Sequence, residues 1–127
     1  MNSKQLFIDH INRSSTMQLA TIANDTPWIC TVSYAIDSDN VCYWLSNRQT
    51  QHSQHVRQNE SVAVAIVVNH SDKQGIQMQG KAYELSGDEA VTADNIYSQR
   101  YGKNEKRLAE ALSDDPTLRS GSRGYGR

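Results

Sequence analysis

No stretch of this sequence approaches the roughly 20 consecutive apolar residues that a helix needs to cross a bilayer. The first residues also lack a long apolar core followed by a small-residue cleavage site, so they do not resemble a secretion signal. Only two cysteines are present, Cys30 and Cys42, and neither belongs to a Cys-x-x-Cys or Cys/His ligand pattern. We therefore expect a soluble, cytoplasmic protein with free thiols and no membrane partner.

An excess of charge of either sign is also missing. The 127 residues carry 13 Lys and Arg against 14 Asp and Glu, a formal net charge of -1. Without a positive field, the chain is not expected to bind nucleic acid. The sequence contains no P-loop, no Gly-x-Gly-x-x-Gly and no His-Glu-x-x-His, so the enzyme classes built on those motifs are excluded. The length predicts a single hydrophobic core.

The pattern of apolar residues predicts a mainly β chain with flanking helices. Predicted strands are Met17–Ala23, Trp28–Ile36, Val41–Ser46, Ser61–Val68 and Gly75–Leu85. A first helix capped by Ser3 should end near Arg13, a short helix should begin at Thr50, and two more should cover Glu89–Arg100 and Asn104–Leu112. The turn over residues 37–40 is short enough to join its two strands as an antiparallel hairpin.

Two of the later strands carry information about burial. Residues 62–68 form a nearly continuous apolar run, which predicts a central strand buried on both faces. In the next strand, Gln77 and Gln79 share one face. Directed inward they would need a polar ligand, because burying an unpaired amide is costly, and directed outward they would be ordinary surface.

The polar connector between residues 46 and 61 is the first place where chemistry is expected. It leaves a strand at the Ser46 hydroxyl and enters a helix whose free amides Thr50 can cap. A helix N-terminus with Arg48 and His52 nearby suits a phosphate or another anion. The alternative is that Thr50 is only a cap and that the histidines occupy a solvated helix face.

Other kinds of site find little support in the sequence. His52 and His55 are three residues apart on one helix face, but no carboxylate or cysteine follows at a matching step, so we expect no metal site. Burial in apolar strands raises the pKa of a thiol, so neither cysteine is expected to be a nucleophile, and the catalytic residues stay unknown. Residues 114–127 are rich in Gly, Ser and Arg and predict a flexible tail after a single domain over residues 1–113.

Several short segments, taken in order, resemble the pyridoxamine 5'-phosphate oxidase-like, FMN-binding split-barrel family. The matching segments are Leu19-Ala20-Thr21-Ile22, Asp25-x-Pro27-Trp28, Tyr43-x-Leu45-Ser46, Gln51-His52-Ser53-Gln54-His55-Val56-x-x-Asn59-x-x-Val62-Ala63-Val64 and Ile76-Gln77-Met78-Gln79-Gly80-x-Ala82. The resemblance covers residues 5–101. It implies a six-stranded split β-barrel with flanking helices, here lacking or shortened at the C-terminal strand, that forms a homodimer with two FMN molecules at its interface.

The resemblance also assigns residues to the cofactor. By position, Ser46 and Thr50 would contact the FMN phosphate, while Gln51 and His52 stand where the family usually has basic residues. The loss of a guanidinium there removes a charge-assisted contact worth about 1.5 to 3 kcal/mol, unless Arg48, Arg57 or a partner residue replaces it. Cys30 stands where the oxidases of the family often have an arginine. The remaining expected cofactor contacts are the backbone of Thr31 and Val32, which would line the flavin ring, and the residues Leu45 and Gln77, of which Gln77 would hydrogen-bond the flavin or line its pocket.

If FMN binds, the resemblance implies two-electron chemistry in which a hydride enters the flavin from a reduced nicotinamide or a substrate. The Arg/His substrate residues of true pyridoxamine phosphate oxidases have no counterpart before Arg127, which excludes that particular activity. A non-catalytic module that carries flavin or another small ligand is the main alternative. A haem-handling split barrel, using the histidines at positions 10, 52, 55 and 70, is a third.

Overall fold

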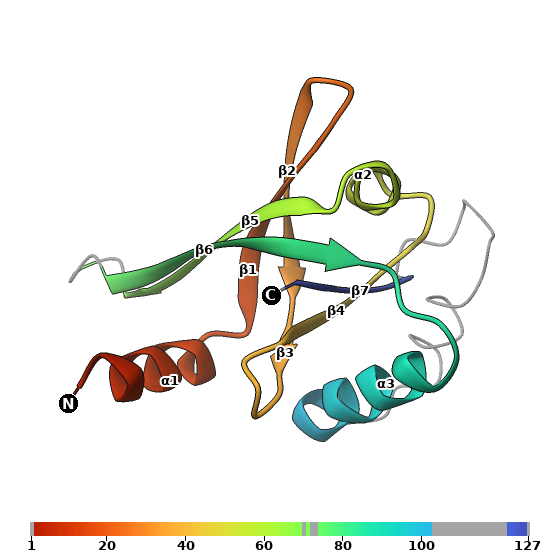
Figure 1. The fold of residues 1–127 in the computed structure, drawn as a ribbon. Coiled ribbons are helices and arrows are strands. Elements are labelled where there is room, and N and C mark those ends of the chain that lie inside the picture. The colour runs from red at the N-terminus through yellow and green to blue at the C-terminus, as the bar shows by residue number, and fades with distance from the viewer. Residues whose placement is uncertain (1, 70, 72–73, 103–121, 127) are drawn as a thin grey trace.

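The computed structural model describes residues 2–69, 71, 74–102 and 122–126, and the ribbon in Figure 1 shows a strongly twisted sheet with three helices around it. The helices are α1 (Ser3–Arg13), α2 (Gln51–Gln58) and α3 (Gly87–Tyr101). The strands are β1 (Thr16–Ala23), β2 (Thr26–Ser33), β3 (Ala35–Ile36), β4 (Cys42–Ser46), β5 (Ser61–Asn69), β6 (Gln74–Tyr83) and β7 (Ser122–Gly126). The predicted helix Asn104–Leu112 lies outside the described residues.

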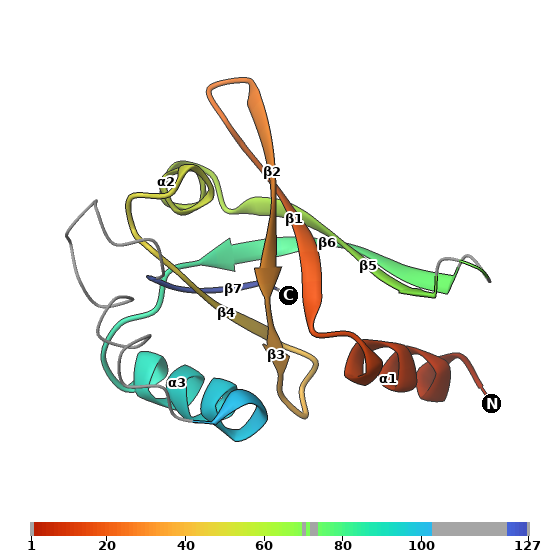
Figure 2. The ribbon, with the colours of Figure 1, turned by 180° about the vertical axis from the view of Figure 1, so that it is seen from behind.

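The seven strands form one sheet in the order β2-β1-β5-β6-β7-β4-β3. The two edge strands, β2 and β3, are separated in sequence by Tyr34 alone, so the sheet must curl until its edges approach each other. This arrangement is a split barrel, as predicted, because the edges meet without closing the ladder. Both ribbon views show the β1–β2 hairpin projecting beyond the other strands, with α1 and α3 near the opposite end (Figures 1 and 2).

The predicted strand Trp28–Ile36 is interrupted at Tyr34. The backbone N–H of Tyr34 donates to the carbonyl of Ser15, 3.1 Å away, and its fully buried hydroxyl donates to the carbonyl of Ile11 at 2.6 Å. The guanidinium of Arg100 lies 5.1 Å from the centre of the Tyr34 ring and bonds the carbonyl of Ser14. We call this group the Tyr34 clasp, and it fastens α3 to the corner between α1 and β1.

The apolar run of residues 62–68 lies in β5, which pairs with β1 and β6 and therefore occupies the predicted interior of the sheet. Burial on both faces was the wrong expectation. Val62, Val64 and Ile66 are buried, whereas Ala63 and Ala65 are half-buried and Val67 is 46% exposed. The outer face of β5 is left open because no described helix covers it.

Two smaller differences concern the ends of elements. The cap of α1 is Asn2 and not Ser3, because the Asn2 side chain accepts from the backbone of Gln5 while the Gln5 side chain accepts from the backbone of Asn2. At the other end, residues 122–126, assigned to a tail by their composition, pair as β7 between β4 and β6. Strand pairing needs only backbone groups, so a segment poor in apolar residues can join a sheet.

Candidate functional site

The connector predicted to carry chemistry is a tight turn from the end of β4 into α2. The Thr50 N–H donates to the carbonyl of Asn47 at 3.0 Å, and the buried Asn47 side chain accepts from the N–H of Gln49 at 2.8 Å. Just before this turn, the Ser46 hydroxyl is buried and has no hydrogen-bond partner among the described residues. The first amides of a helix also lack partners within the helix. The turn therefore offers several neutral hydrogen-bond donors in one place.

Thr50 is the predicted cap of α2. Its Oγ1 accepts from the N–H of Ser53, lies 2.8 Å from the Ser53 hydroxyl and donates to the carbonyl of Asn47 at 2.8 Å. A hydroxyl has one proton to donate and two lone pairs, so these contacts use its capacity. Thr50 therefore organises the turn, and its side chain could reach a phosphate only by giving up one of them.

The histidines of α2 do not lie on a solvated face, so that alternative was wrong. His52 is 8% exposed and His55 is 4% exposed. The Nε2 of Gln51 lies 2.8 Å from the Nε2 of His55, whose Nδ1 lies 3.0 Å from the hydroxyl of Thr21. Because an amide nitrogen only donates, the His55 Nε2 accepts, and its proton resides on Nδ1. Gln51, one of the expected phosphate ligands, is thus committed to His55.

His52 brings no positive charge to the turn at neutral pH. Burial, and secondarily the neighbouring His55, lower the pKa of its imidazole from 6.5 to about 4. Its Nε2 lies 3.4 Å from the Thr50 hydroxyl. A neutral imidazole can donate or accept a hydrogen bond with a ligand but adds no positive charge to a phosphate site.

Arg48 and Arg57, the possible replacements for the missing guanidinium, share one carboxylate. The Nε of Arg48 lies 3.4 Å from Oε1 of Glu84, and the Nη1 of Arg57 lies 3.2 Å from the same oxygen. Arg57 also donates to the carbonyl of Arg48 at 2.7 Å. This Arg–Glu–Arg cluster holds one net positive charge beside the turn, spread over two partly exposed side chains.

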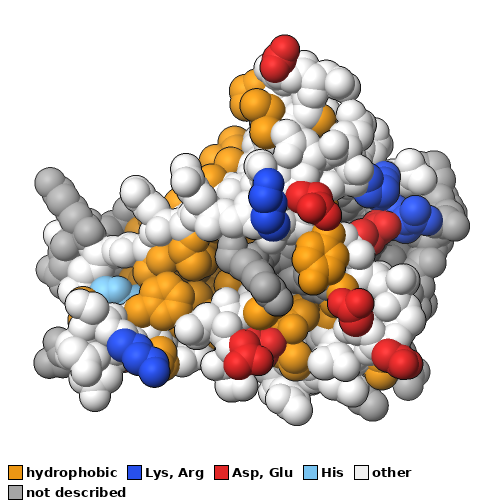
Figure 3. Space-filling view, in the orientation of Figure 1, with side chains coloured by type: hydrophobic (Ala, Val, Ile, Leu, Met, Phe, Trp, Pro, Cys, Tyr) orange, Lys and Arg blue, Asp and Glu red, His pale blue; other side chains and the backbone are white. Residues whose placement is uncertain are grey.

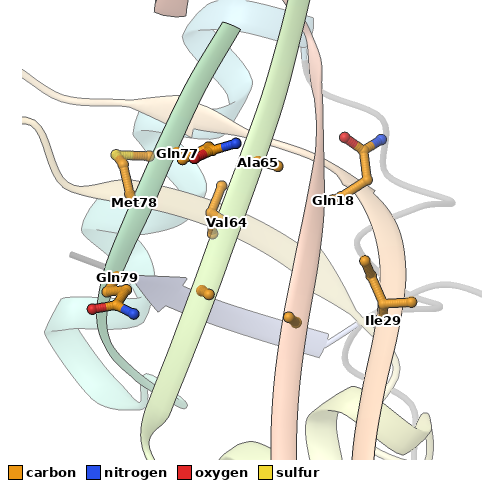
Figure 4. Close-up of a pocket in the computed structure, with 9 residues that line it drawn as sticks. Gln18, Ile29, Val64, Ala65, Gln77, Met78 and Gln79 are labelled. Carbon is orange, nitrogen blue, oxygen red and sulfur yellow. The ribbon is translucent and has the colours of Figure 1, made fainter.

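A second candidate region lies on the outer face of the sheet. Side chains of β2, β1, β5 and β6 line a hollow of about 580 Å³ with an alanine floor and no charged residue. Figure 4 shows Gln18 on one side of β5 and Gln77 and Gln79 on the other. We call this hollow the outer trough, and its lining is Gln18, Ala20, Ile29, Ala63, Val64, Ala65, Gln77, Met78 and Gln79. The outward alternative for the two glutamines is therefore the correct one.

Strand register explains why the outer trough forms. Ala20 pairs with Ile29 and Ala63, and Ala63 pairs with Gln79, so these four side chains share one row of one face. The next row on that face runs from Thr31 through Gln18 and Ala65 to Gln77. Small residues in the two middle strands create the floor. Gln18 and Gln79 were missed as site residues, although their alternation with buried neighbours was a usable signal.

The residues predicted on β2 and β4 differ in their accessibility. Thr31 is exposed on the outer face, whereas Val32 is buried and Leu45 is half-buried. Cys30 is also half-buried, and burial raises the pKa of its thiol to about 11, as it does for Cys42. Neither thiol is therefore a ready nucleophile at neutral pH.

The predicted cofactor residues thus fall into two groups on opposite faces of the sheet. Thr21 points inward to His55 of α2, while its neighbour Ala20 points outward into the outer trough. One group is the β4–α2 turn with Ser46, Thr50, Gln51 and His52, and the other is the outer trough with Gln77. The β4–α2 turn therefore belongs with the inner side of β1, and the outer trough with its outer side.

Among residues 2–69, 71, 74–102 and 122–126, no three His, Cys, Asp or Glu side chains gather closely enough to hold a metal ion. None of the helices described is long and apolar enough to span a membrane.

The sequence is similar to a known protein family and to a curated relative. The sequence model described as pyridoxamine 5'-phosphate oxidase matches residues 5–120. The UPF0306 protein PM1958 of Pasteurella multocida is 29% identical over 98 residues, which cover 74% of this chain and 66% of that protein. The chain thus spans slightly less than two thirds of this relative.

Solved structures resemble the fold at low sequence identity. A protein of unknown function from Agrobacterium tumefaciens has a TM-score of 0.72 at 20% identity, with 98% of this chain and 52% of that chain covered. A heme binding protein from Mycobacterium smegmatis (TM-score 0.73, 16% identity) is covered over 51% of its length, and all of this chain is aligned. The heme storage protein HutZ of Vibrio cholerae (TM-score 0.73, 14% identity) aligns with all of this chain and is covered over 90%. These likenesses establish the split-barrel fold.

Proposed function

We propose, from the premise that this chain belongs to the pyridoxamine 5'-phosphate oxidase family, that it binds a flavin of the FMN type between two copies of itself. The observation that carries the proposal is the separation of the candidate residues into two half-sites on opposite faces of the sheet. In a homodimer, the β4–α2 turn of one copy and the outer trough of the second would enclose the same ligand.

The residues of each half-site suit a different part of a flavin. The outer trough offers a flat apolar floor with amides at its sides, which fits an uncharged ring whose edge carries donors and acceptors. The β4–α2 turn offers the unpartnered Ser46 hydroxyl and the first amides of α2, which fit the polar end. A bound flavin would supply two-electron transfer between a donor such as NADH or NADPH and an acceptor.

The same face supports the proposed homodimer. Ile22 and Ile29 are exposed on the outer face beside the alanine floor, and Ile29 is 65% exposed. Figure 3 shows apolar side chains on the surface of the projecting hairpin. Exposed apolar clusters of this kind mark interaction surfaces, because leaving them in water is unfavourable. A second copy would cover them and close the open side of the outer trough.

A flavin titration tests the proposal. Quenching of FMN fluorescence by the natively purified chain should saturate at one flavin per copy. Ser46→Ala and Gln77→Ala should each weaken binding several-fold, because each removes one hydrogen-bonding group. The matched variants Ser38→Ala and Gln99→Ala change exposed residues elsewhere and should bind like the parent. Absence of quenching at a large excess of protein would refute the proposal.

Mixing the two variants tests the shared site directly. If each ligand is held by one turn and the opposite trough, a mixed dimer of Ser46→Ala and Gln77→Ala contains one intact and one doubly altered site. After equal mixing and subunit exchange, half of the dimers are mixed, so about one quarter of all sites regain parental affinity. Sites formed within one copy would regain none.

A flavin carrier without turnover is the second candidate. It is favoured by the neutral His52 at the turn and by the raised pKa values of the Cys30 and Cys42 thiols on β2 and β4, because none of these three groups is a ready acid, base or nucleophile at neutral pH. Anaerobic mixing of the flavin-loaded protein with NADH or NADPH separates the two candidates. Bleaching of the flavin band supports an oxidoreductase, whereas tight binding without bleaching supports the carrier.

Haem is a weaker proposal than flavin for this chain. His55 uses both ring nitrogens for Thr21 and Gln51, and His10 and His52 are buried, so none of the three is placed to ligate an iron without rearrangement. The fourth histidine, at position 70, lies outside the described residues. The likeness to haem proteins is at the level of the fold. Addition of haem should therefore leave its Soret band unshifted.

A further inference from the structure

We infer that the β4–α2 turn accepts a neutral hydroxyl-bearing group as readily as a phosphate, so that this chain discriminates little between FMN and riboflavin. The inference rests on the proposed flavin binding and concerns the ligand class that the turn selects. It follows from what each polar side chain around the turn already contacts.

Gln51 is the first of these side chains. Its amide nitrogen lies 2.8 Å from Nε2 of His55, and the His55 ring continues this contact to the Thr21 hydroxyl on β1. Turning Gln51 toward a ligand would leave the Nε2 of a buried imidazole without its donor, which costs free energy. Position 51 therefore holds a neutral side chain that is directed along the helix toward His55.

His52 and Thr50 contribute no charge either. The His52 ring is buried next to the Thr50 hydroxyl, in surroundings that disfavour a cation, and the Thr50 hydroxyl is used within the turn. Among the described residues of the turn, the Ser46 hydroxyl has no hydrogen-bond partner, and the first backbone amides of α2 have none within the helix.

The nearby guanidiniums are held by Glu84. Arg48 and Arg57 approach the same carboxylate oxygen, at 3.4 and 3.2 Å, and a phosphate would have to compete with that carboxylate for either of them. Both side chains are partly exposed, so solvent and salt screen the remaining charge.

Neutral donors distinguish poorly between the two flavins. A hydroxyl or an amide donates to a ribityl oxygen or to a phosphate oxygen. The bonds to the ionised phosphate are charge-assisted and therefore stronger, but among the described residues no uncommitted guanidinium at the turn adds an ion pair to them. The phosphate of FMN also pays a larger desolvation cost than a hydroxyl when it enters the turn. These two effects oppose each other, which leaves a small difference in affinity.

Parallel titrations with FMN and riboflavin test the inference. We expect the two dissociation constants to differ by less than about tenfold, the size of one charge-assisted contact. FMN binding tighter than riboflavin by tenfold or more would overturn the inference while leaving the proposed flavin binding intact. Failure of both ligands to bind would overturn the proposed function and the inference with it.

A charge-restoring variant locates the cause. Gln51→Arg should raise the preference for FMN over riboflavin by about tenfold, because a guanidinium then stands at the turn. Gln99→Arg makes the same change on an exposed residue of α3 and should leave the preference unchanged. An equal rise in both variants, or no rise with Gln51→Arg in a protein whose circular dichroism is unaltered, would contradict the assignment of this selectivity to position 51.

Discussion

The Nδ1 of His55 lies 3.0 Å from the hydroxyl of Thr21, a contact that joins α2 to β1 across 34 residues of sequence. We predict that Thr21→Val, which keeps the shape and removes the hydroxyl, lowers the free energy of unfolding by about 1 to 3 kcal/mol, because a buried N–H loses its acceptor. Urea unfolding measures this loss. Thr16→Val, at an exposed position of the same strand, should change the stability by less than about 0.5 kcal/mol.

A second prediction concerns acid stability. The native His52 has a pKa of about 4 against an ordinary value of 6.5, so between these values the unfolded chain binds a proton that the native chain does not. The free energy of unfolding is therefore unaffected by this group above pH 6.5. It decreases as the pH falls toward 4, by at most about 3 kcal/mol.

Unfolding measured at intervals from pH 7 to pH 4 checks this dependence. In His52→Gln the free energy of unfolding should fall less steeply between pH 6.5 and pH 4, because the titrating group is gone. In Gln54→Ala its dependence on pH should match that of the parent. An unchanged slope in His52→Gln would show that this imidazole titrates alike in the native and unfolded states.

The apolar part of the outer face gives a third prediction. Ile29→Asp places a charge at a 65% exposed position beside the outer trough, where a covering copy would have to desolvate it. Light scattering after gel filtration should then report monomers at concentrations at which the parent is dimeric. Ile8→Asp alters an exposed isoleucine of α1 and should leave the dimer intact. A parent that is monomeric at all concentrations would contradict the prediction.

Glu84 offers a fourth prediction. Glu84→Gln removes the carboxylate that Arg48 and Arg57 share, which leaves two guanidiniums without this neutralising charge beside the turn. The preference for FMN over riboflavin should rise several-fold and should weaken again with added salt. Glu60→Gln removes one charge at another exposed position and provides the control. Equal responses of the two variants would indicate an effect of net charge alone.

Sequence patterns predicted most of the fold because it depends on local signals. The cap at Thr50 and the position of β5 inside the sheet follow from hydroxyl placement and from the apolar run at residues 62–68. The interruption at Tyr34 was not predictable, since its partners Ile11 and Ser15 come from a remote corner. Tertiary contacts overrode local preference there.

The candidate site was predicted less completely, for a similar reason. Ser46 and Gln77 were named from their places in the chain; the structure buries the Ser46 hydroxyl without a partner and leaves Gln77 exposed in the outer trough, and their role in binding stays a prediction. The polar character of α2 predicted solvated histidines. His55 is instead buried, and the hydroxyl of Thr21 on β1 provides its hydrogen-bond partner there. The separation of the site into two faces depends on strand register, which periodicity alone does not give.

The Tyr34 clasp sets an order on folding during synthesis. Arg100 bonds the carbonyl of Ser14 and packs over Tyr34, so the corner between α1 and β1 is completed by a residue 86 positions later. In a growing chain this corner is therefore complete only after α3 has been made, and closing so long a loop is slow compared with forming the hairpins. Proteolysis of ribosome-stalled chains should show α1 better protected once Arg100 has emerged.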